Sequence, residues 1–110
     1  MIKSEHQIQN EIRVALSQHG CKVFRVNVGS GKTVSGQYFT TGVPPGFPDL
    51  CGYRIADGKM FFVEVKTPTG RLRPDQITFK KAVENDACIY TVARSAADAV
   101  EAVTGELQED

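Results

Sequence analysis

The stretch LCGYRIADGKMFFVEVKT, residues 50–67, has the pattern of a β-hairpin and decides the fold. Two runs rich in apolar residues flank Asp57-Gly58, a pair that suits a type I′ turn between antiparallel strands. In the second run, Glu64 and Lys66 are two residues apart, so both side chains leave the same face of the strand. An isolated buried charge is costly even after its surroundings relax. Two charged side chains in the most hydrophobic run of the chain therefore need a partner or a function.

The sequence on both sides of this hairpin predicts an α/β domain, with a mixed sheet flanked by helices in the order α-β-β-β-α-β-α. Ser4 and Ser95 are suitable N-caps for the first and last helices, and Gly20 and Gly105 are suitable stops. Pro74 lies at a favourable first-turn position for the middle helix. The predicted elements cover residues 4–20, 21–29, 50–56, 59–67, 74–86, 87–93 and 95–105.

The segment over residues 29–48 is rich in Gly, Ser, Thr and Pro and is predicted to be a long loop. Loops of this length in compact domains tend to be functional or disordered. Within it, GSGKT (29–33) is similar to the end of a phosphate-binding P-loop, but the full pattern needs a glycine where Val26 stands. We therefore expect no nucleotide cofactor and keep only Lys32 as a candidate phosphate contact.

The chain has 110 residues, which suits a single domain over residues 1–110 with an acidic C-terminal tail over about residues 105–110. No apolar run approaches the length of about 18 residues that indicates a membrane-spanning helix, and the N-terminus lacks a signal-peptide core. A cytoplasmic protein without a membrane partner is expected. The three cysteines are far apart and show no C-x-x-C spacing, which argues against a zinc site or a disulfide framework.

The net charge of zero hides an uneven distribution of charged residues. Residues 98–110 contain five acidic side chains and no basic one, which leaves residues 1–97 with a balance of +5. Seven Lys and Arg side chains lie in the segment from Arg54 to Lys81. A basic central segment suits contact with a polyanion, although a normally solvated surface would explain the charge equally well.

The predicted hairpin also defines a candidate metal site. A turn at residues 57 and 58 places residue 50 roughly opposite residue 65, which brings Asp49 beside Glu64 and Lys66. Two carboxylates at one point repel each other unless a cation lies between them. Mg²⁺ suits this position, because it takes oxygen ligands and is usually held by one or two carboxylates together with water and substrate phosphate. A lysine beside such a site can orient an attacking water and stabilise the charge that develops on a phosphate.

The motif GFPDL, residues 46–50, followed by EVK, residues 64–66, resembles the PD-(D/E)xK nuclease signature. The ordered set SEHQIQ, RVNVG, GFPDL, FVEVKTPTGRLRPDQ and YTVARS is similar to the VRR-Nuc branch of that superfamily, in the short stand-alone form common in phages and prophages. This resemblance covers nearly the whole chain and implies a restriction-endonuclease-like core. It also implies a location in the cytoplasm of a bacterium or of a phage-infected host cell.

The resemblance implies a role for each residue of the central motif. Asp49 and Glu64 would bind the metal, together with the main-chain carbonyl of Val65. Lys66 would be the catalytic lysine.

Two helices would complete the site. Gln76, on the inward face of the middle helix with Phe79 and Val83, matches a glutamine that lines the family's site. Glu5 matches the acidic residue of the first helix, and Gln9, one turn further on, would support it.

Each of these residues also has a purely structural interpretation. Asp49 could cap a turn after a proline. Glu64 and Lys66 could form the solvated face of an edge strand. Gln76 could belong to the helix start, and Glu5 could be a first-turn acid favoured by the helix dipole. The family order and the converging faces of the five residues favour a site over these separate explanations.

The function that follows is a Mg²⁺-dependent DNA endonuclease, with Mn²⁺ able to substitute, that hydrolyses phosphodiester bonds. The resemblance further suggests a homodimer that selects branched or junction DNA. Two alternatives remain: an inactive nuclease-fold module that binds DNA, and a scaffold or inhibitor subunit that acts through the acidic tail. The sequence leaves open whether one metal or two are bound. The expected contacts to the DNA backbone are Lys32, Arg71, Arg73, Lys80 and Lys81.

Overall fold

The computed structural model describes residues 2–26, 30–40 and 42–106, and its centre is a four-stranded mixed sheet. The strand order is β1-β4-β5-β6, in which β1 pairs antiparallel with β4, β4 pairs antiparallel with β5, and β5 pairs parallel with β6. The helices and strands are α1 (Glu5–Gln18), β1 (Cys21–Arg25), β2 (Ser30–Lys32), β3 (Tyr38–Thr40), β4 (Leu50–Arg54), β5 (Met60–Val65), α2 (Pro74–Val83), β6 (Ile89–Ala93) and α3 (Ala96–Thr104). The predicted order α-β-β-β-α-β-α is confirmed for the sheet and its helices, with one additional hairpin.

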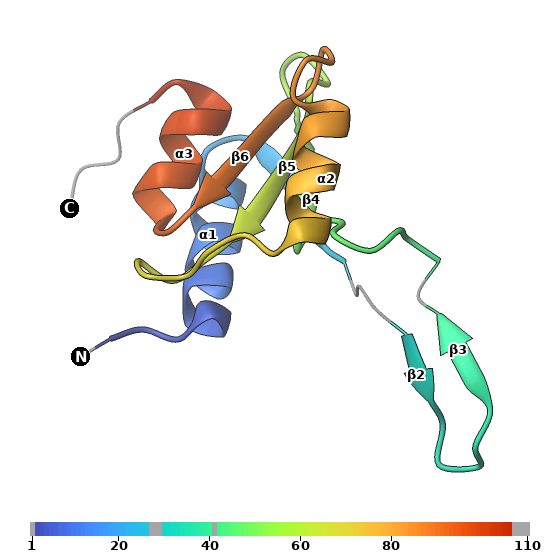
Figure 1. The fold of residues 1–110 in the computed structure, drawn as a ribbon. Coiled ribbons are helices and arrows are strands. Elements are labelled where there is room, and N and C mark those ends of the chain that lie inside the picture. Colours follow the sequence, from blue (N-terminus) through green and yellow to red (C-terminus); the bar gives the residue numbers. More distant parts are fainter. Residues whose placement is uncertain (1, 27–29, 41, 107–110) are drawn as a thin grey trace.

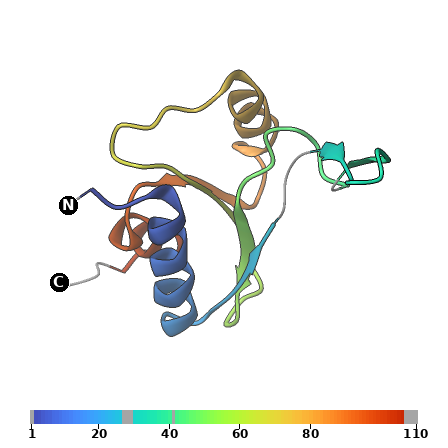
Figure 2. The same ribbon diagram turned by 90° about the horizontal axis from the view of Figure 1, so that it is seen from below.

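Helices cover both faces of this sheet. Figures 1 and 2 show α1 and α3 side by side on one face, whereas α2 lies on the other. The core between the sheet, α1 and α3 is built from alternate residues of β5, namely Phe61, Val63 and Val65, all fully buried. On the helices it contains Ile8, Ile12, Ala15, Leu16, Ala99, Val100 and Val103.

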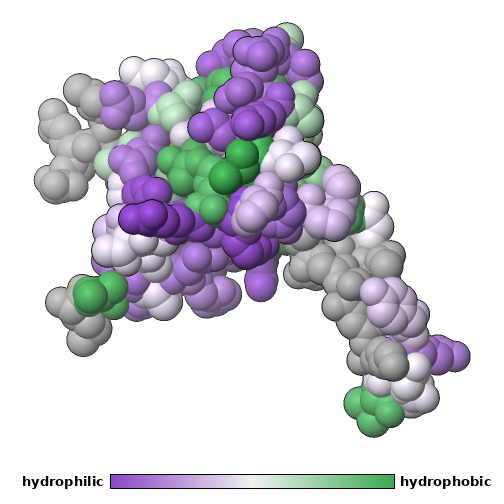
Figure 3. Space-filling view, viewed as in Figure 1, coloured by the Kyte–Doolittle hydropathy of each residue, from purple (hydrophilic) through white to green (hydrophobic). Residues whose placement is uncertain are grey.

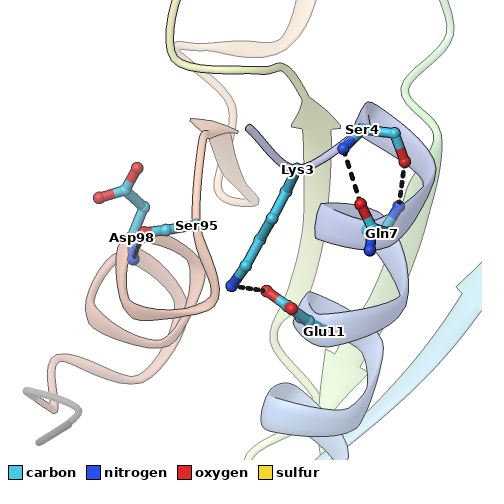
Figure 4. A network of polar contacts seen from close by, with 6 residues as sticks. All are labelled: Lys3, Ser4, Gln7, Glu11, Ser95 and Asp98. Carbon is cyan, nitrogen blue, oxygen red and sulfur yellow. Dashed lines mark hydrogen bonds and ion pairs between the residues drawn. The ribbon is translucent and has the colours of Figure 1, made fainter. Parts of the chain in front are cut away.

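Side-chain caps fix where two of the helices begin. The Ser4 side chain accepts from the Gln7 N–H (3.1 Å), and the Gln7 side chain accepts from the Ser4 N–H (3.0 Å), which makes a capping box at α1. At α3, Ser95 Oγ accepts from the Asp98 N–H (3.1 Å), as Figure 4 shows. Both N-caps predicted from the sequence are therefore confirmed.

The connection between β4 and β5 is not the predicted type I′ turn. That turn needs a positive φ at both central residues, but in the described chain only glycines adopt one, here Gly58 at 72°. Residues 55–58 form a longer loop, in which the Gly58 N–H donates to the Arg54 carbonyl (2.7 Å). The Asp57 side chain accepts from Arg54 Nε (3.0 Å) and from the Lys59 N–H (3.1 Å), and these bonds hold the loop in this form.

The longer loop also changes the register of the hairpin. Leu50 pairs with Val63 and not with residue 65, so the predicted register is wrong by two residues. Continued by one residue, the observed register places Asp49 opposite Glu64. The proximity of these two carboxyl groups is therefore retained, on a different alignment of the strands.

Residues 30–40 form a second hairpin where the sequence predicts only a loop. β2 and β3 pair antiparallel, and the Thr33 N–H donates to the Gln37 carbonyl (2.8 Å) inside the turn. Within the described chain this hairpin does not join the four-stranded sheet, and it extends from the main body as an arm (Figures 1 and 3). Because residues 30–32 of this motif form strand β2 and not the start of a helix, they also lack the setting of a P-loop.

The described helices are all too short or too polar to cross a membrane. The three cysteines are free thiols, with Cys21 buried and Cys51 and Cys88 half-buried.

Residues 42–49 lead from the arm to β4 and pack against α2. The Phe47 ring meets Phe62 of β5 and Phe79 of α2 edge-on, at centroid distances of 5.7 and 5.1 Å. Gly46 lies so close to α2 that a Cβ at this position would come within 2.1 Å of the Asp75 carbonyl oxygen. Gly46 also has a φ of 83°, which side chains rarely adopt. The segment before Asp49 is thus tied to the start of α2.

We expect Gly46→Ala to destabilise the protein far more than Gly42→Ala. Both glycines have a positive φ, 83° and 85°, so both alanines are strained by about 1–2 kcal/mol. Only Gly46 faces a neighbouring backbone, since an added Cβ at Gly42 meets nothing within 4 Å. The overpacking should cost Gly46→Ala about another 1–3 kcal/mol in urea denaturation. Equal midpoints for the two variants would show that the close contact with α2 is absent.

Candidate active site

Asp49 and Glu64 meet where β4 begins and β5 ends. The Asp49 Oδ2 atom accepts a hydrogen bond from the Val65 N–H (3.1 Å), which holds the carboxylate against β5. The Asp49 carbonyl accepts from the Val26 N–H (2.8 Å), so its backbone is fixed from the other side by β1. Glu64 is only 1% exposed, and the Asp49 carboxyl group lies close enough to raise the pKa of Glu64. A turn cap alone does not account for this Asp49, because its side chain bonds to the neighbouring strand.

The pKa of the Glu64 carboxyl group is raised to about 9. Burial is the main cause, followed by the hydrogen bond to Asp49 and the negative charge of Asp49. The positive charge of Lys66 lowers the pKa of Glu64, and the negative charge of Glu5 raises it. Burial and the neighbouring carboxylate therefore favour the protonated form of Glu64, and a bound cation would favour its ionised form.

Lys66 follows β5 and shares the face of the sheet that Glu64 occupies. It is 5% exposed, and its N–H donates to the Ala93 carbonyl of β6 (3.1 Å). β5 lies between β4 and β6, so it is an interior strand. The structural alternative, in which Glu64 and Lys66 form the solvated face of an edge strand, is therefore wrong.

The N-terminal end of α1 lies near this cluster. Glu5 is exposed in the first turn, yet close enough for its charge to affect the pKa of Glu64. Gln9, one turn further on, is 8% exposed, and its Oε1 atom is buried with no hydrogen-bond partner among the described residues. By contrast, Glu11 pairs with Lys3 (2.9 Å), as Figure 4 shows. Of the two acidic residues of α1, Glu5 is therefore the one whose charge affects the pKa of Glu64.

Gln76 both faces the site and belongs to the start of α2, the two interpretations that the sequence offered. It is 4% exposed and lies on the inward face of α2, in line with Phe79, whose ring packs on Phe62. Its Oε1 atom accepts from the Arg73 N–H (2.8 Å), so it also belongs to the helix start. The structure therefore places Gln76 on the site face of the sheet while its amide oxygen serves the backbone.

Tyr90 belongs to the same face and was not singled out by the sequence. It pairs with Phe62 across the parallel β5–β6 ladder, and its ring lies 6.3 Å from that of Phe79. Its pKa is raised to about 12, first by burial and then by the charges of Glu64, Asp49 and Glu84. The motif YTVARS contains Tyr90, but only the strand pairing shows that it faces the carboxyl pair.

Three of the predicted DNA contacts line one groove beside this face, with a volume of about 530 Å³. Arg71, Lys80 and Lys81 contribute to it, and Arg94, which the sequence did not suggest, lies in the same groove. Arg73 is not among the described residues that line it and pairs with Asp75 (Nε–Oδ1 3.4 Å). Lys32 lies in the arm, and its side chain is outside the part of the chain that the structure describes.

The residues at the carboxyl pair fit a hard divalent cation. Asp49 and Glu64 supply two neighbouring carboxyl groups, and a divalent cation beside them would favour the ionised form of Glu64, whose pKa is raised by burial. No group of three or more His, Cys, Asp or Glu side chains suited to a metal occurs in the described chain. Two carboxylates with a backbone oxygen suit Mg²⁺, which keeps several water ligands, better than metals that need a full set of side chains.

The mixed sheet, its flanking helices and the cluster of half-buried Asp49 with buried Glu64 and Lys66 define a domain with a restriction-endonuclease-like fold. Comparison with protein families gives the particular branch, because the model of the VRR-NUC domain matches residues 3–97. The chain therefore belongs to the VRR-NUC family and has a nuclease-type function on DNA. A search of curated proteins found no match to the chain.

Proposed function

We propose that this protein is a Mg²⁺-dependent DNA endonuclease whose active site is built around Asp49, Glu64 and Lys66. The observation that carries the proposal is the buried Glu64 side chain, which lies opposite the half-buried Asp49 and shares its face of the sheet with the buried Lys66. Such an arrangement is costly for a protein that only binds or scaffolds. It is useful to an enzyme that must place a cation and a water molecule at a phosphate.

The residues have distinct roles in this proposal. Asp49, Glu64 and the Val65 carbonyl would hold Mg²⁺, which when bound supplies the positive charge that polarises the scissile phosphate. Lys66 orients the attacking water and stabilises the negative charge that develops on the phosphate oxygens. The water oxygen bonds to phosphorus, the bond to the 3′ oxygen breaks, and the water proton ends on that leaving oxygen.

The supporting residues act on the position of these groups. Glu5, whose charge affects the pKa of Glu64, would supply a carboxylate near the cation position, and Gln9 follows it one turn further along α1 with an Oε1 atom that has no partner among the described residues. Gln76 fixes the start of α2 against the site. We assign none of these three a direct role in proton transfer.

Titration of the metal is the first test of the proposal. Mg²⁺ or Mn²⁺ should bind to the wild-type protein in isothermal titration calorimetry, and Asp49→Ala should abolish that binding because half of the carboxyl pair is removed. Glu11→Ala, which removes an exposed carboxylate paired with Lys3, is the matched control and should bind as the wild type does. A protein without any metal site would favour the scaffold interpretation and overturn the proposal.

A cleavage panel tests the activity itself. Flap, nicked, splayed and four-way DNA substrates are incubated with and without Mg²⁺ or Mn²⁺, beside the Asp49→Ala variant. We expect metal-dependent cleavage that the variant lacks, with preference for branched substrates. Metal binding without cleavage of any substrate would leave the inactive DNA-binding module as the better interpretation.

The groove of Arg71, Lys80 and Lys81 is the proposed contact to the DNA backbone. We expect the double variant Lys80→Gln/Lys81→Gln to bind DNA more weakly and with a smaller salt dependence. If each lysine neutralises one phosphate, the slope of log K against log salt should fall by about 2. The exposed pair Lys22→Gln/Lys59→Gln, outside the groove, provides a control with the same loss of charge. An unchanged slope in the groove variant would remove these contacts.

A homodimer is part of the proposal, because a chain of this size covers little more than one active site and duplex cleavage needs two. Sedimentation velocity at micromolar concentration, with and without junction DNA, tests it. A monomer under both conditions would contradict the dimer and leave the site unaffected.

A further inference from the structure

Arg94 connects the end of β6 to the turn that follows Lys66. In the parallel β5–β6 ladder Val65 pairs with Ala93, so Lys66 and Arg94 leave the sheet side by side. The Arg94 Nη1 atom donates to two carbonyl oxygens, those of Thr67 (2.6 Å) and Gly70 (2.7 Å). These residues are 27 and 24 positions away along the chain, so the contact is tertiary.

The turn that Arg94 binds forms a wall along the Lys66 side chain. The Gly70 N–H donates to the Thr67 carbonyl (3.0 Å), which closes residues 67–70 into a turn. Gly70 lies beside the stem of the lysine, because a Cβ built on this glycine, which has none, would come 3.5 Å from Lys66 Cδ. Movement of this turn would therefore change the surroundings of the Lys66 methylene chain.

Arg94 is itself fixed from a second side. Its N–H donates to Asp98 Oδ2 (2.9 Å), and the Asp98 N–H in turn donates to the Ser95 side chain at the start of α3. The backbone of Arg94 is thus anchored to α3 while its guanidinium group is anchored to the turn. Because Nη1 is already bonded to two carbonyls, this atom is committed to the protein rather than to a phosphate in the neighbouring groove.

We propose that Arg94 is a positioning residue for the catalytic lysine: its guanidinium clamps the Thr67–Gly70 turn, and the turn holds the Lys66 stem in its buried position. The inference deepens the proposed function and rests on it for the effect on cleavage. The effect on the position of Lys66 does not depend on the activity and can be measured separately.

The test uses three variants of the full chain. Arg94→Met keeps most of the side-chain stem and removes every donor, whereas Arg94→Lys keeps donors that can reach carbonyl oxygens. Arg13→Met removes an exposed arginine of α1 and is the control. If Arg94→Met does not fold by circular dichroism, Arg94→Gln takes its place.

We expect Arg94→Met to lower kcat by about 10- to 100-fold, as misplacement of a catalytic group does, with an unchanged KM. Acylation of Lys66 by an N-hydroxysuccinimide ester, followed by mass spectrometry, should become faster by about tenfold as the turn opens. Arg94→Lys should recover part of both effects, and Arg13→Met should show neither. The slope of DNA affinity against salt should stay unchanged, because no phosphate contact is lost.

Two results would overturn this role. If Lys66 is acylated at the wild-type rate in a folded Arg94→Met protein, the clamp does not position the lysine. If the variant instead loses DNA affinity with a salt slope smaller by about 1, Arg94 is a phosphate contact. A wild-type protein that cleaves no DNA would refute the proposed function alone, because the acylation experiment still decides the role of Arg94.

Discussion

Replacing Lys66 by methionine is expected to lower kcat by about 100-fold or more, while the Kd for DNA stays within about twofold of the wild-type value. Methionine retains a flexible apolar stem in this buried position but cannot orient water or stabilise negative charge. Because the groove of Arg71, Lys80 and Lys81 is unchanged, DNA binding should persist. Single-turnover cleavage and fluorescence anisotropy separate the two quantities.

The control for this experiment is Lys59→Met, which removes an exposed lysine at the start of the second strand of the hairpin. Its cleavage rate should equal that of the wild type. Comparable turnover by Lys66→Met would overturn the role assigned to the lysine, and a parallel loss of DNA binding would assign Lys66 to the binding of substrate.

Glu64→Gln is expected to stabilise the metal-free protein, by an amount that grows as the pH rises from about 5 to 9. The pKa of Glu64 is raised from 4.5 to about 9 in the fold, so between these values the folded protein holds a proton that the unfolded chain has released. The free energy of unfolding of the wild type therefore falls with rising pH, by up to about 1.4 kcal/mol per pH unit from this group. Glutamine cannot ionise, so the free energy of unfolding of the Glu64→Gln variant should lack this decrease with pH.

Urea denaturation at pH 5, 7 and 9 in the presence of a chelator measures the difference between the two proteins. Mg²⁺ should reduce this difference in stability, because a cation that binds ionised Asp49 and Glu64 stabilises only the wild-type fold. Glu11→Gln, at an exposed ion pair, is the control and should change the stability by less than about 1 kcal/mol. A difference that does not vary with pH would show that Glu64 is ionised in the fold.

The fold could be predicted from the sequence wherever local signals are strong. Helix α1 has a period of buried residues, a Ser4 cap and a glycine stop, and all three are local properties of the chain. The turn of the central hairpin could not be predicted in detail, because the conformation of Asp57 depends on its bonds to Arg54 and Lys59. The arm was missed because the Gly and Ser content of residues 29–37 concealed the short strand-forming run Tyr38–Thr40.

The candidate site divides in the same way. Asp49, Glu64 and Lys66 lie in one hairpin, so their proximity follows from a short-range motif even with the register wrong by two residues. Tyr90 and Arg94 reach the site through the parallel pairing of β6 with β5, which joins distant parts of the chain. No spacing rule along the sequence indicates which strand a parallel crossover will place beside another.

The contact between Gly46 and Asp75 connects helix α2 to the segment that carries Asp49, so the two should move together. Gly46 touches the first turn of α2, Phe47 packs on Phe79 within the helix, and Asp49 follows two residues later. A displacement of α2 should move residues 46–49 as well, because Gly46 and Phe47 both pack closely against the helix. A shift of α2, whose outer surface carries Lys80 and Lys81, would therefore also change the position of the segment that leads to Asp49.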